Sequence, residues 1–158
     1  MNDTNTEEKL EGKNVFVLGS KPELDKFVGR FKDTPILVID NEDHGNSVQQ
    51  LREVARLVGL RAATGRNHSR FMVVLKDVDD ILRTCLNDGD HEAAGAFGTI
   101  LRLGPKAGVI TMMTASRMDA RVFPGEVQHC FNEAVLLDED KTEVVQHPDP
   151  YFYMFKRK

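Results

Sequence analysis

The feature that most constrains the fold is a series of short apolar runs, each separated from the next by a segment with helical periodicity. The runs contain few polar residues, which is typical of strands that are covered on both faces of a sheet. The intervening segments place apolar residues three and four positions apart, which is typical of helices that pack one face against a sheet. The runs span 14–18, 34–40, 70–75, 108–114 and 134–137, and the helical segments span 22–31, 48–58, 79–86, 91–103 and 124–131.

Strands that alternate with helices predict an α/β fold with three layers, in which helices cover both faces of a mostly parallel sheet. A charged turn at 138–141 and a further run at 142–145 predict an antiparallel hairpin near the C-terminus. The chain has 158 residues, which suits one domain. The polar residues 1–12 predict a flexible leader or linker, so we expect the folded domain at 13–158.

The composition argues against two classes of protein. Apolar residues make up 41% and charged residues 29% of the chain, which is typical of soluble globular proteins, and no apolar run approaches the length of a membrane span. The net charge of −4 provides no general attraction to nucleic acid. Cys85 and Cys130 are far apart and the five histidines lack zinc-ligand spacing, which indicates reduced thiols and no metal. We therefore expect a cytoplasmic protein that neither inserts into a membrane nor binds nucleic acid.

Local signals predict where the helices begin and end. Asn46 or Ser47 is suited to cap the helix at 48–58, and Gly59 is expected to close it before a basic loop at 61–70. Asp90 is expected to cap the helix at 91–103, which the Gly-Pro pair at 104–105 then ends.

The middle of the chain resembles the FtsK/SpoIIIE family of P-loop ATPases. The resemblance rests on FMVVLKD, on ILRLGPKAGVITMMTASR and on the order of elements over about 14–145. It is strongest for the degenerate C-terminal ATPase-like domain of type VII secretion proteins of the EssC/EccC type. The resemblance implies a RecA-like P-loop NTPase fold in the cytosolic part of a membrane-bound secretion ATPase. The expected partners are neighbouring ATPase domains of the same chain or complex, and a signal helix of a secreted substrate that docks in an apolar groove.

The phosphate-binding loop of such ATPases is altered in this chain. A working loop reads G-x-x-x-x-G-K-[ST], because its glycines let backbone N–H groups surround the phosphates and its lysine neutralises them. Gly19 is present, but Leu24 stands where the second glycine belongs, Asp25 replaces the lysine and Lys26 replaces the hydroxyl residue. Pro22 also removes one N–H from the loop. An aspartate at this place would repel a polyphosphate, so the loop predicts no productive nucleotide binding.

The residues that would activate water are also altered. In the family an apolar strand ends in Asp-Glu, where the aspartate supports Mg²⁺ and the glutamate polarises the attacking water. Asp77 keeps the acid after Lys76, but Val78 stands where the glutamate belongs and cannot accept a proton. Asp79 and Asp80 are out of register and are interpreted as the acidic first turn of a helix.

These departures predict a catalytically degenerate domain that acts as a protein-binding or regulatory module, with no catalytic residue and no cofactor. Gly19, Lys21 and Asp77 are then vestigial cofactor-binding residues, and the polar turn at 114–117 is interpreted as loop caps. One alternative is an active NTPase with an unorthodox phosphate loop, in which Lys21 or Lys26 would bind phosphate and Asp77 would hold Mg²⁺ with ATP. Another alternative is a stand-alone α/β adaptor.

Two surface features are candidate partner-binding sites. Arg52 and Arg56 are four positions apart on one helix face, where they would either be solvated or dock an acidic partner such as a neighbouring ATPase domain. Tyr151 and Phe152 begin an aromatic patch at 151–155. The patch would either pack on the domain's own sheet as an edge strand or form an exposed interaction site.

Overall fold

The computed structural model describes residues 10, 12–18, 21–65, 69–115, 121–122, 130, 133–138 and 141–146. Apart from residue 130, the predicted helix at 124–131 lies outside these residues, as do the aromatic patch at 151–155 and most of the predicted leader. Within the described part, no helix is both long enough and apolar enough to cross a membrane.

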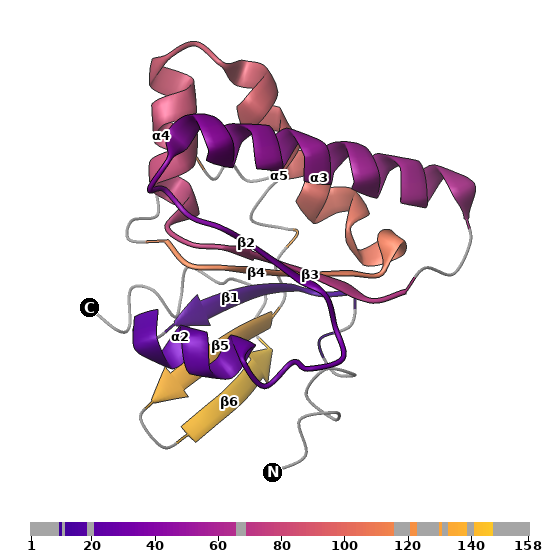
Figure 1. Cartoon of the computed structure of the whole chain (residues 1–158), viewed down its shortest axis with the longest axis vertical. Helices are drawn as coiled ribbons and strands as arrows, with labels where there is room; N and C mark the ends of the chain where they lie inside the picture. Colours follow the sequence, from indigo (N-terminus) through magenta and orange to yellow (C-terminus); the bar gives the residue numbers. More distant parts are fainter. Residues whose placement is uncertain are drawn as a thin grey trace.

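A six-stranded sheet in the order β2-β3-β4-β1-β5-β6 forms the centre of the fold (Figure 1). The first five strands are parallel, and β6 pairs antiparallel with β5, so the predicted C-terminal hairpin is confirmed. The strands are β1 (Asn14–Leu18), β2 (Ile36–Ile39), β3 (Phe71–Leu75), β4 (Val109–Met113), β5 (Glu133–Asp138) and β6 (Lys141–Gln146).

The helices cover both faces of this sheet, which confirms the predicted three-layer α/β fold. The connection from β1 to β2 runs over β4 and β3 to the β2 end of the sheet, and the connections from β2 to β3 and from β3 to β4 run in the opposite direction. Because such crossovers are right-handed, their helices lie on opposite faces. Figure 1 shows α2 on one side of the sheet and the other helices on the opposite side. The helices are α2 (Lys21–Val28), α3 (His44–Thr64), α4 (Val78–Asn87) and α5 (His91–Leu103), followed by the short 3₁₀ helix η1 (Pro105–Ala107).

Each face of the sheet has its own hydrophobic core, because successive strand residues point to opposite faces. Val15, Val74 and Ile110 pack against Leu24 and Phe27 of α2. The alternate residues of the same strands pack against α3, α4 and α5. Leu10, although it falls in the predicted leader, is fully buried in the core on the α2 side.

Helix α3 is longer at both ends than the sequence predicts. Asp43, rather than Asn46 or Ser47, caps it, and its side chain accepts a hydrogen bond from the Asn46 N–H at 3.2 Å. At the other end Gly59 does not close the helix, and the chain stays helical to Thr64 before Gly65 takes the left-handed conformation at φ 64°. Arg61 explains the continuation, because its guanidinium donates to the carbonyl oxygens of Ser69 and Ala107 and thereby holds the last turns against the rest of the fold.

Helix α5 matches its predicted bounds, and Gly104 explains its abrupt end. The Gly104 N–H donates to the Ile100 oxygen at 2.8 Å, and a Cβ at position 104 would lie 2.4 Å from that same oxygen. Only glycine fits this close approach. The chain then passes through η1 into β4, so Gly104 fixes the position of α5 over the sheet.

Candidate functional site

Three adjacent strands bring the candidate residues to one edge of the sheet. The carboxyl ends of β1, β3 and β4 meet there, with Met113 of β4 in register with both Leu75 of β3 and Phe16 of β1. From this edge the chain enters α2 after β1, on one face, and α4 after β3, on the other face. Such a switch point at the carboxyl ends of parallel strands is where open α/β sheets bind ligands.

Asp77 joins β3 to α4 at this edge in an unusual conformation. It has φ 51° and ψ 48°, and it is the one non-glycine residue with positive φ among those described. Thr114, which follows β4, holds it in place. The Asp77 N–H donates to Thr114 Oγ1 at 3.0 Å, and the Val78 N–H donates to the Thr114 carbonyl oxygen at 3.1 Å. Thr114 therefore acts as a loop cap, as the sequence predicts, whereas the rest of that turn, 116–117, lies outside the described residues.

Two ion pairs connect α2 to the end of β3. Lys21 Nζ lies 3.4 Å from Asp77 Oδ2, and Lys76 Nζ lies 2.7 Å from Asp25 Oδ1. In each pair the residue next to β3 is mostly buried, with 22% of the Asp77 side chain and 21% of the Lys76 side chain exposed. Each side chain of opposite charge comes from α2 and is mostly exposed, so the sheet edge is neutralised by the protein's own residues.

The structure thus brings together two of the three residues predicted as vestigial, Lys21 and Asp77. Gly19 lies outside the described residues. Lys26 is exposed in the last turn of α2. The pair between Asp25 and Lys76 was not predicted from the sequence. A signal for it was present in the sequence, because Asp25 stands where a phosphate loop has lysine and Lys76 stands immediately before Asp77.

The first turn of α4 carries no acceptor at the place of the missing glutamate. Val78 is fully buried in the core. Asp79 is also fully buried, and Arg83 Nη2 lies 3.5 Å from its Oδ2. The same guanidinium lies 3.1 Å from Asp80 Oδ1, with 45% of the Asp80 side chain exposed. Arg83 therefore binds both carboxylates of this turn, which agrees with their interpretation as part of a helix start.

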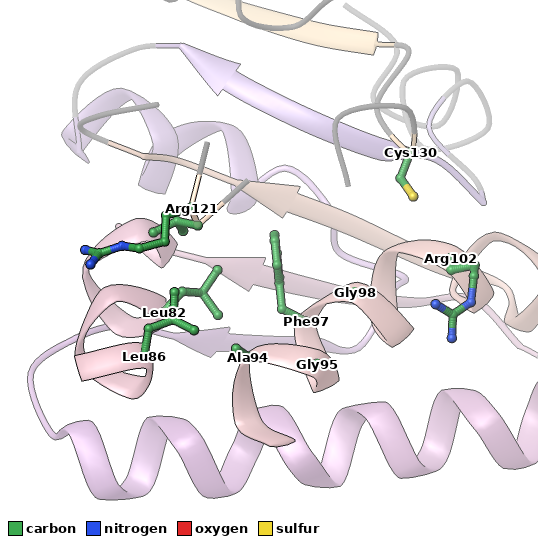
Figure 2. A pocket seen from close by; sticks show the side chains of 10 residues that line it. Leu82, Leu86, Ala94, Gly95, Phe97, Gly98, Arg102, Arg121 and Cys130 are labelled. Carbon is green, nitrogen blue, oxygen red and sulfur yellow. The ribbon is translucent and has the colours of Figure 1, made fainter. Parts of the chain in front are cut away.

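An apolar groove of about 410 Å³ lies between α4 and α5. Figure 2 shows Leu82 and Leu86 of α4 near Phe97 of α5, with Arg102 at the far end of α5. Gly95 and Gly98 also line the groove, and a Cβ at either glycine would meet no atom within 4 Å. Ala94, Arg121, Val122 and Cys130 complete the lining.

The predicted partner-binding arginines have different surroundings. Arg52 donates to both carboxylate oxygens of Asp90 at 3.0 and 2.8 Å, so it links α3 to the start of α5. Arg56 is exposed on α3, whereas Tyr151 and Phe152 lie outside the described residues. Asp90 also caps α5, where its side chain accepts a hydrogen bond from the Ala93 N–H. This hydrogen bond, and after it the charge of Arg52, holds the pKa of Asp90 below its ordinary value.

The remaining titratable groups have structural surroundings. Cys85 packs in the core as predicted, where burial, followed by the charges of Asp90 and Asp88, raises the pKa of its thiol. Among the described residues, no three His, Cys, Asp or Glu side chains are placed together to hold a metal ion.

Comparison with known proteins gives the fold its context. No family model and no curated protein matches the chain. A structure of the pCW3 conjugation coupling protein TcpA, an FtsK/SpoIIIE-like protein in its monomer form with ATPγS, matches 94% of the chain with a TM-score of 0.64 and 10% identity. The chain therefore has the fold of this FtsK/SpoIIIE-like protein. The fold therefore agrees with the resemblance seen in the sequence.

Two type VII secretion ATPases also match. The cytoplasmic domain of EccC from Thermomonospora curvata matches 78% of the chain with a TM-score of 0.59 and 11% identity. EssC from Geobacillus thermodenitrificans, covering its ATPases 2 and 3, matches 89% of the chain with a TM-score of 0.50 and 13% identity. The chain spans 66% of the length of TcpA, 20% of EccC and 37% of EssC, so it corresponds to part of each.

Proposed function

We propose that this chain is an ATPase-fold domain that does not turn over ATP and that serves as a cytoplasmic protein-binding or regulatory module of a type VII secretion ATPase. Fold likeness to secretion and coupling ATPases supports the general class. The charged residues at the carboxyl ends of β1, β3 and β4 support the proposed loss of ATP turnover. The groove between α4 and α5 supports a role in binding a partner.

The observation that carries the proposal is the pattern of charges at the carboxyl ends of the strands, which differs from that of a working site. In a working site a loop lysine and Mg²⁺ neutralise the phosphates, and an aspartate after the strand supports the metal. Here the loop position is Asp25, and it pairs with Lys76 beside the strand, while Lys21 pairs with Asp77. A polyphosphate would have to displace two ion pairs and approach the Asp25 carboxylate. With Val78 buried in place of a water-activating glutamate, no described group here would activate an attacking water.

The groove between α4 and α5 suits an apolar helix of a partner. Its volume is within the range of ligand sites, and Leu82 and Phe97 provide apolar contact area. Gly95 and Gly98 lie one turn apart on α5, so a partner's backbone would be able to approach closely. Helix-in-groove recognition uses such a surface. We assign the groove to the signal helix of a secreted substrate, and a neighbouring ATPase domain is the second expected partner.

Calorimetric titration with ATP and Mg²⁺ tests the loss of nucleotide binding. The proposal predicts no saturable heat and no rise in melting temperature at about millimolar ATP, because a ligand bound to the native state alone would raise that temperature. Saturable binding at about micromolar ATP would refute it. A gain-of-binding variant tests the cause. Asp25→Lys should create measurable affinity for inorganic pyrophosphate, whereas Glu42→Lys, an equal charge change on the exposed loop after β2, should not.

The groove is tested with a variant that fills it. Gly98→Leu would place a side chain in open space, so the domain should keep its melting temperature and lose binding to substrate signal peptides. Gly59→Leu is the matched control, because position 59 also has open space but lies on α3 outside the groove. Equal binding by the two variants would remove the groove from the proposal.

An active NTPase remains the alternative, favoured by the 3.4 Å approach of Lys21 to Asp77 at the ligand-binding edge. ATP hydrolysis by the wild type that Asp77→Ala abolishes would support this alternative.

A further inference from the structure

One buried side chain connects α5 to another wall of the groove. Asn14, the first residue of β1, is 3% exposed, and its Nδ2 donates to the carbonyl oxygens of Leu101 at 2.6 Å and Cys130 at 3.0 Å. Leu101 lies in the last turn of α5, and Pro105, four positions on, has no N–H for its oxygen. Cys130 lines the groove (Figure 2). A single amide thus caps α5 and holds the backbone of Cys130 beside it.

The sheet register places a second buried polar side chain next to Asn14. Thr111 of β4 is its partner residue in the parallel pairing of β1 with β4. Both side chains point to the α5 side of the sheet, because the alternate residues of their strands belong to the core there. These alternate residues are Phe16, Val109 and Met113. Thr111 is fully buried, and within the described part of the chain neither its Oγ1 nor Asn14 Oδ1 has a hydrogen-bond partner.

These two oxygens suit one small ligand that both donates and accepts. Buried polar groups are nearly always hydrogen-bonded, either to protein or to internal water. Asn14 Oδ1 can only accept, since the two carbonyl oxygens require the amide nitrogen on their side, whereas the Thr111 hydroxyl can donate or accept. Neighbouring strands lie about 4.8 Å apart, so a water about 2.8 Å from each oxygen fits between the two side chains. Gly104 borders the same place, because a Cβ there would lie 3.7 Å from Thr111 Oγ1.

We propose that one internal water molecule bridges Asn14 Oδ1 and Thr111 Oγ1, and that this polar centre positions the Cys130 wall of the groove against α5. The water satisfies the oxygen of the same amide whose nitrogen holds Leu101 and Cys130, so it fixes the orientation of that amide. Asn14 lies behind the groove lining and is a positioning residue for it. Its effect on partner binding rests on the proposed function, whereas the water and the held position of Cys130 do not.

Crystallography tests the bridging water with a pair of matched variants. High-resolution structures of the wild type and of Thr111→Ser, which keeps the hydroxyl, should show one ordered water within hydrogen-bond distance of Asn14 Oδ1 and of that hydroxyl. Thr111→Val has nearly the same shape and lacks the hydroxyl, so its structure should lack that water. A wild type with no water there, or with a direct hydrogen bond between Asn14 and Thr111, would overturn the proposal. A water that Thr111→Val retains in place would overturn it as well.

Alkylation of Cys130 by iodoacetamide tests the positioning role. Asn14→Leu is close in size and cannot donate, so the Cys130 backbone should loosen and its thiol should react about three- to ten-fold faster, the factor expected for the loss of about one hydrogen bond. Thr111→Val should accelerate labelling about two-fold because it leaves the amide oxygen without its bridging water, whereas Thr111→Ser should match the wild type. Cys85, which is buried, is the internal control for the fold.

The Cys85 control decides which variant is read. If Asn14→Leu also exposes Cys85, its fold is lost and Thr111→Val decides. An unchanged Cys130 rate in a folded Asn14→Leu, or in Thr111→Val when Asn14→Leu does not fold, would overturn the positioning role. Labelling needs no partner, so a wild type that fails to bind signal peptides would refute the proposed function and leave this inference standing.

Discussion

The adjacent carboxylates at the start of α4 allow a stringent test of what this part of the candidate site does. Asp79 and Asp80 both contact Arg83, at 3.5 and 3.1 Å, but their side chains are 0% and 45% exposed. The proposed function makes them structural residues of a helix start. The free energy of unfolding should then respond to each substitution according to burial rather than according to distance from the guanidinium.

The magnitudes follow from what each substitution leaves behind. Arg83→Met removes the guanidinium beside a fully buried carboxylate, and loss of one partner of a buried pair costs about 3–5 kcal/mol. Asp79→Ala should cost less, about 2–3 kcal/mol, because Arg83 keeps its contact with Asp80. Asp80→Ala breaks a half-exposed pair and should cost about 0.5 kcal/mol, up to about 1 kcal/mol.

Urea denaturation of the three variants and the wild type measures these differences. The expected order of destabilisation is Arg83→Met, then Asp79→Ala, then Asp80→Ala, with the slope of free energy against urea unchanged. Equal effects of Asp79→Ala and Asp80→Ala would refute the argument from burial. A stable Asp79→Ala variant that lost a wild-type ATPase activity would instead give Asp79 a role in catalysis and contradict the proposed function.

Three further predictions concern two glycines, the two thiols and the Asp90 carboxylate. Gly59→Ala should stabilise the domain by about 0.5–1 kcal/mol, because Gly59 is inside a helix and a Cβ there would meet open space. Gly104→Ala should destabilise the domain by about 1–3 kcal/mol, because its Cβ would lie 2.4 Å from the Ile100 backbone oxygen. Urea denaturation measures both effects. Iodoacetamide should label Cys130 before Cys85, since Cys85 is buried and burial raises its thiol pKa; mass spectrometry reads the order. The folded-state pKa of Asp90 is lowered, so its contribution to stability is present above the pKa of the unfolded state and is lost as pH falls through the folded pKa. Asp90→Asn should remove that part of the acid dependence in unfolding curves.

The elements were predictable where one local signal decided them. The parallel strands β1 to β4 are mostly apolar runs, and α5 has the bounds that Asp90 and Gly104 predict. Helix α3 was predicted too short, because Gly59 resembles a helix end and the contacts of Arg61 that carry the helix past it involve residues up to 46 positions away. Local propensity does not include such contacts.

The candidate site was predictable only in part, for the same reason. The altered residues were apparent one at a time, including Asp25 in the place of a lysine and Val78 in the place of a glutamate. The pairing of Asp25 with Lys76 was not, since the two residues are 51 positions apart and meet only when α2 lies beside the end of β3. A motif comparison therefore indicates which positions differ from the ATPase pattern, and the folded arrangement indicates what the residues at those positions contact.

The two ion pairs between α2 and the end of β3 have a consequence for how the domain would work under the proposed function. In a nucleotide-dependent domain the bound phosphates and metal connect the loop after β1 to the strand that carries the acidic residue. Here Lys21 and Asp25 of α2 reach Asp77 and Lys76 directly, so the connection needs no ligand. Under the proposed function, a partner would then meet the same surface whatever the nucleotide state of neighbouring domains. Amide hydrogen exchange of α2 and α4 should accordingly be the same with and without ATP and Mg²⁺, whereas protection that increases with ATP would show that the edge still responds to nucleotide.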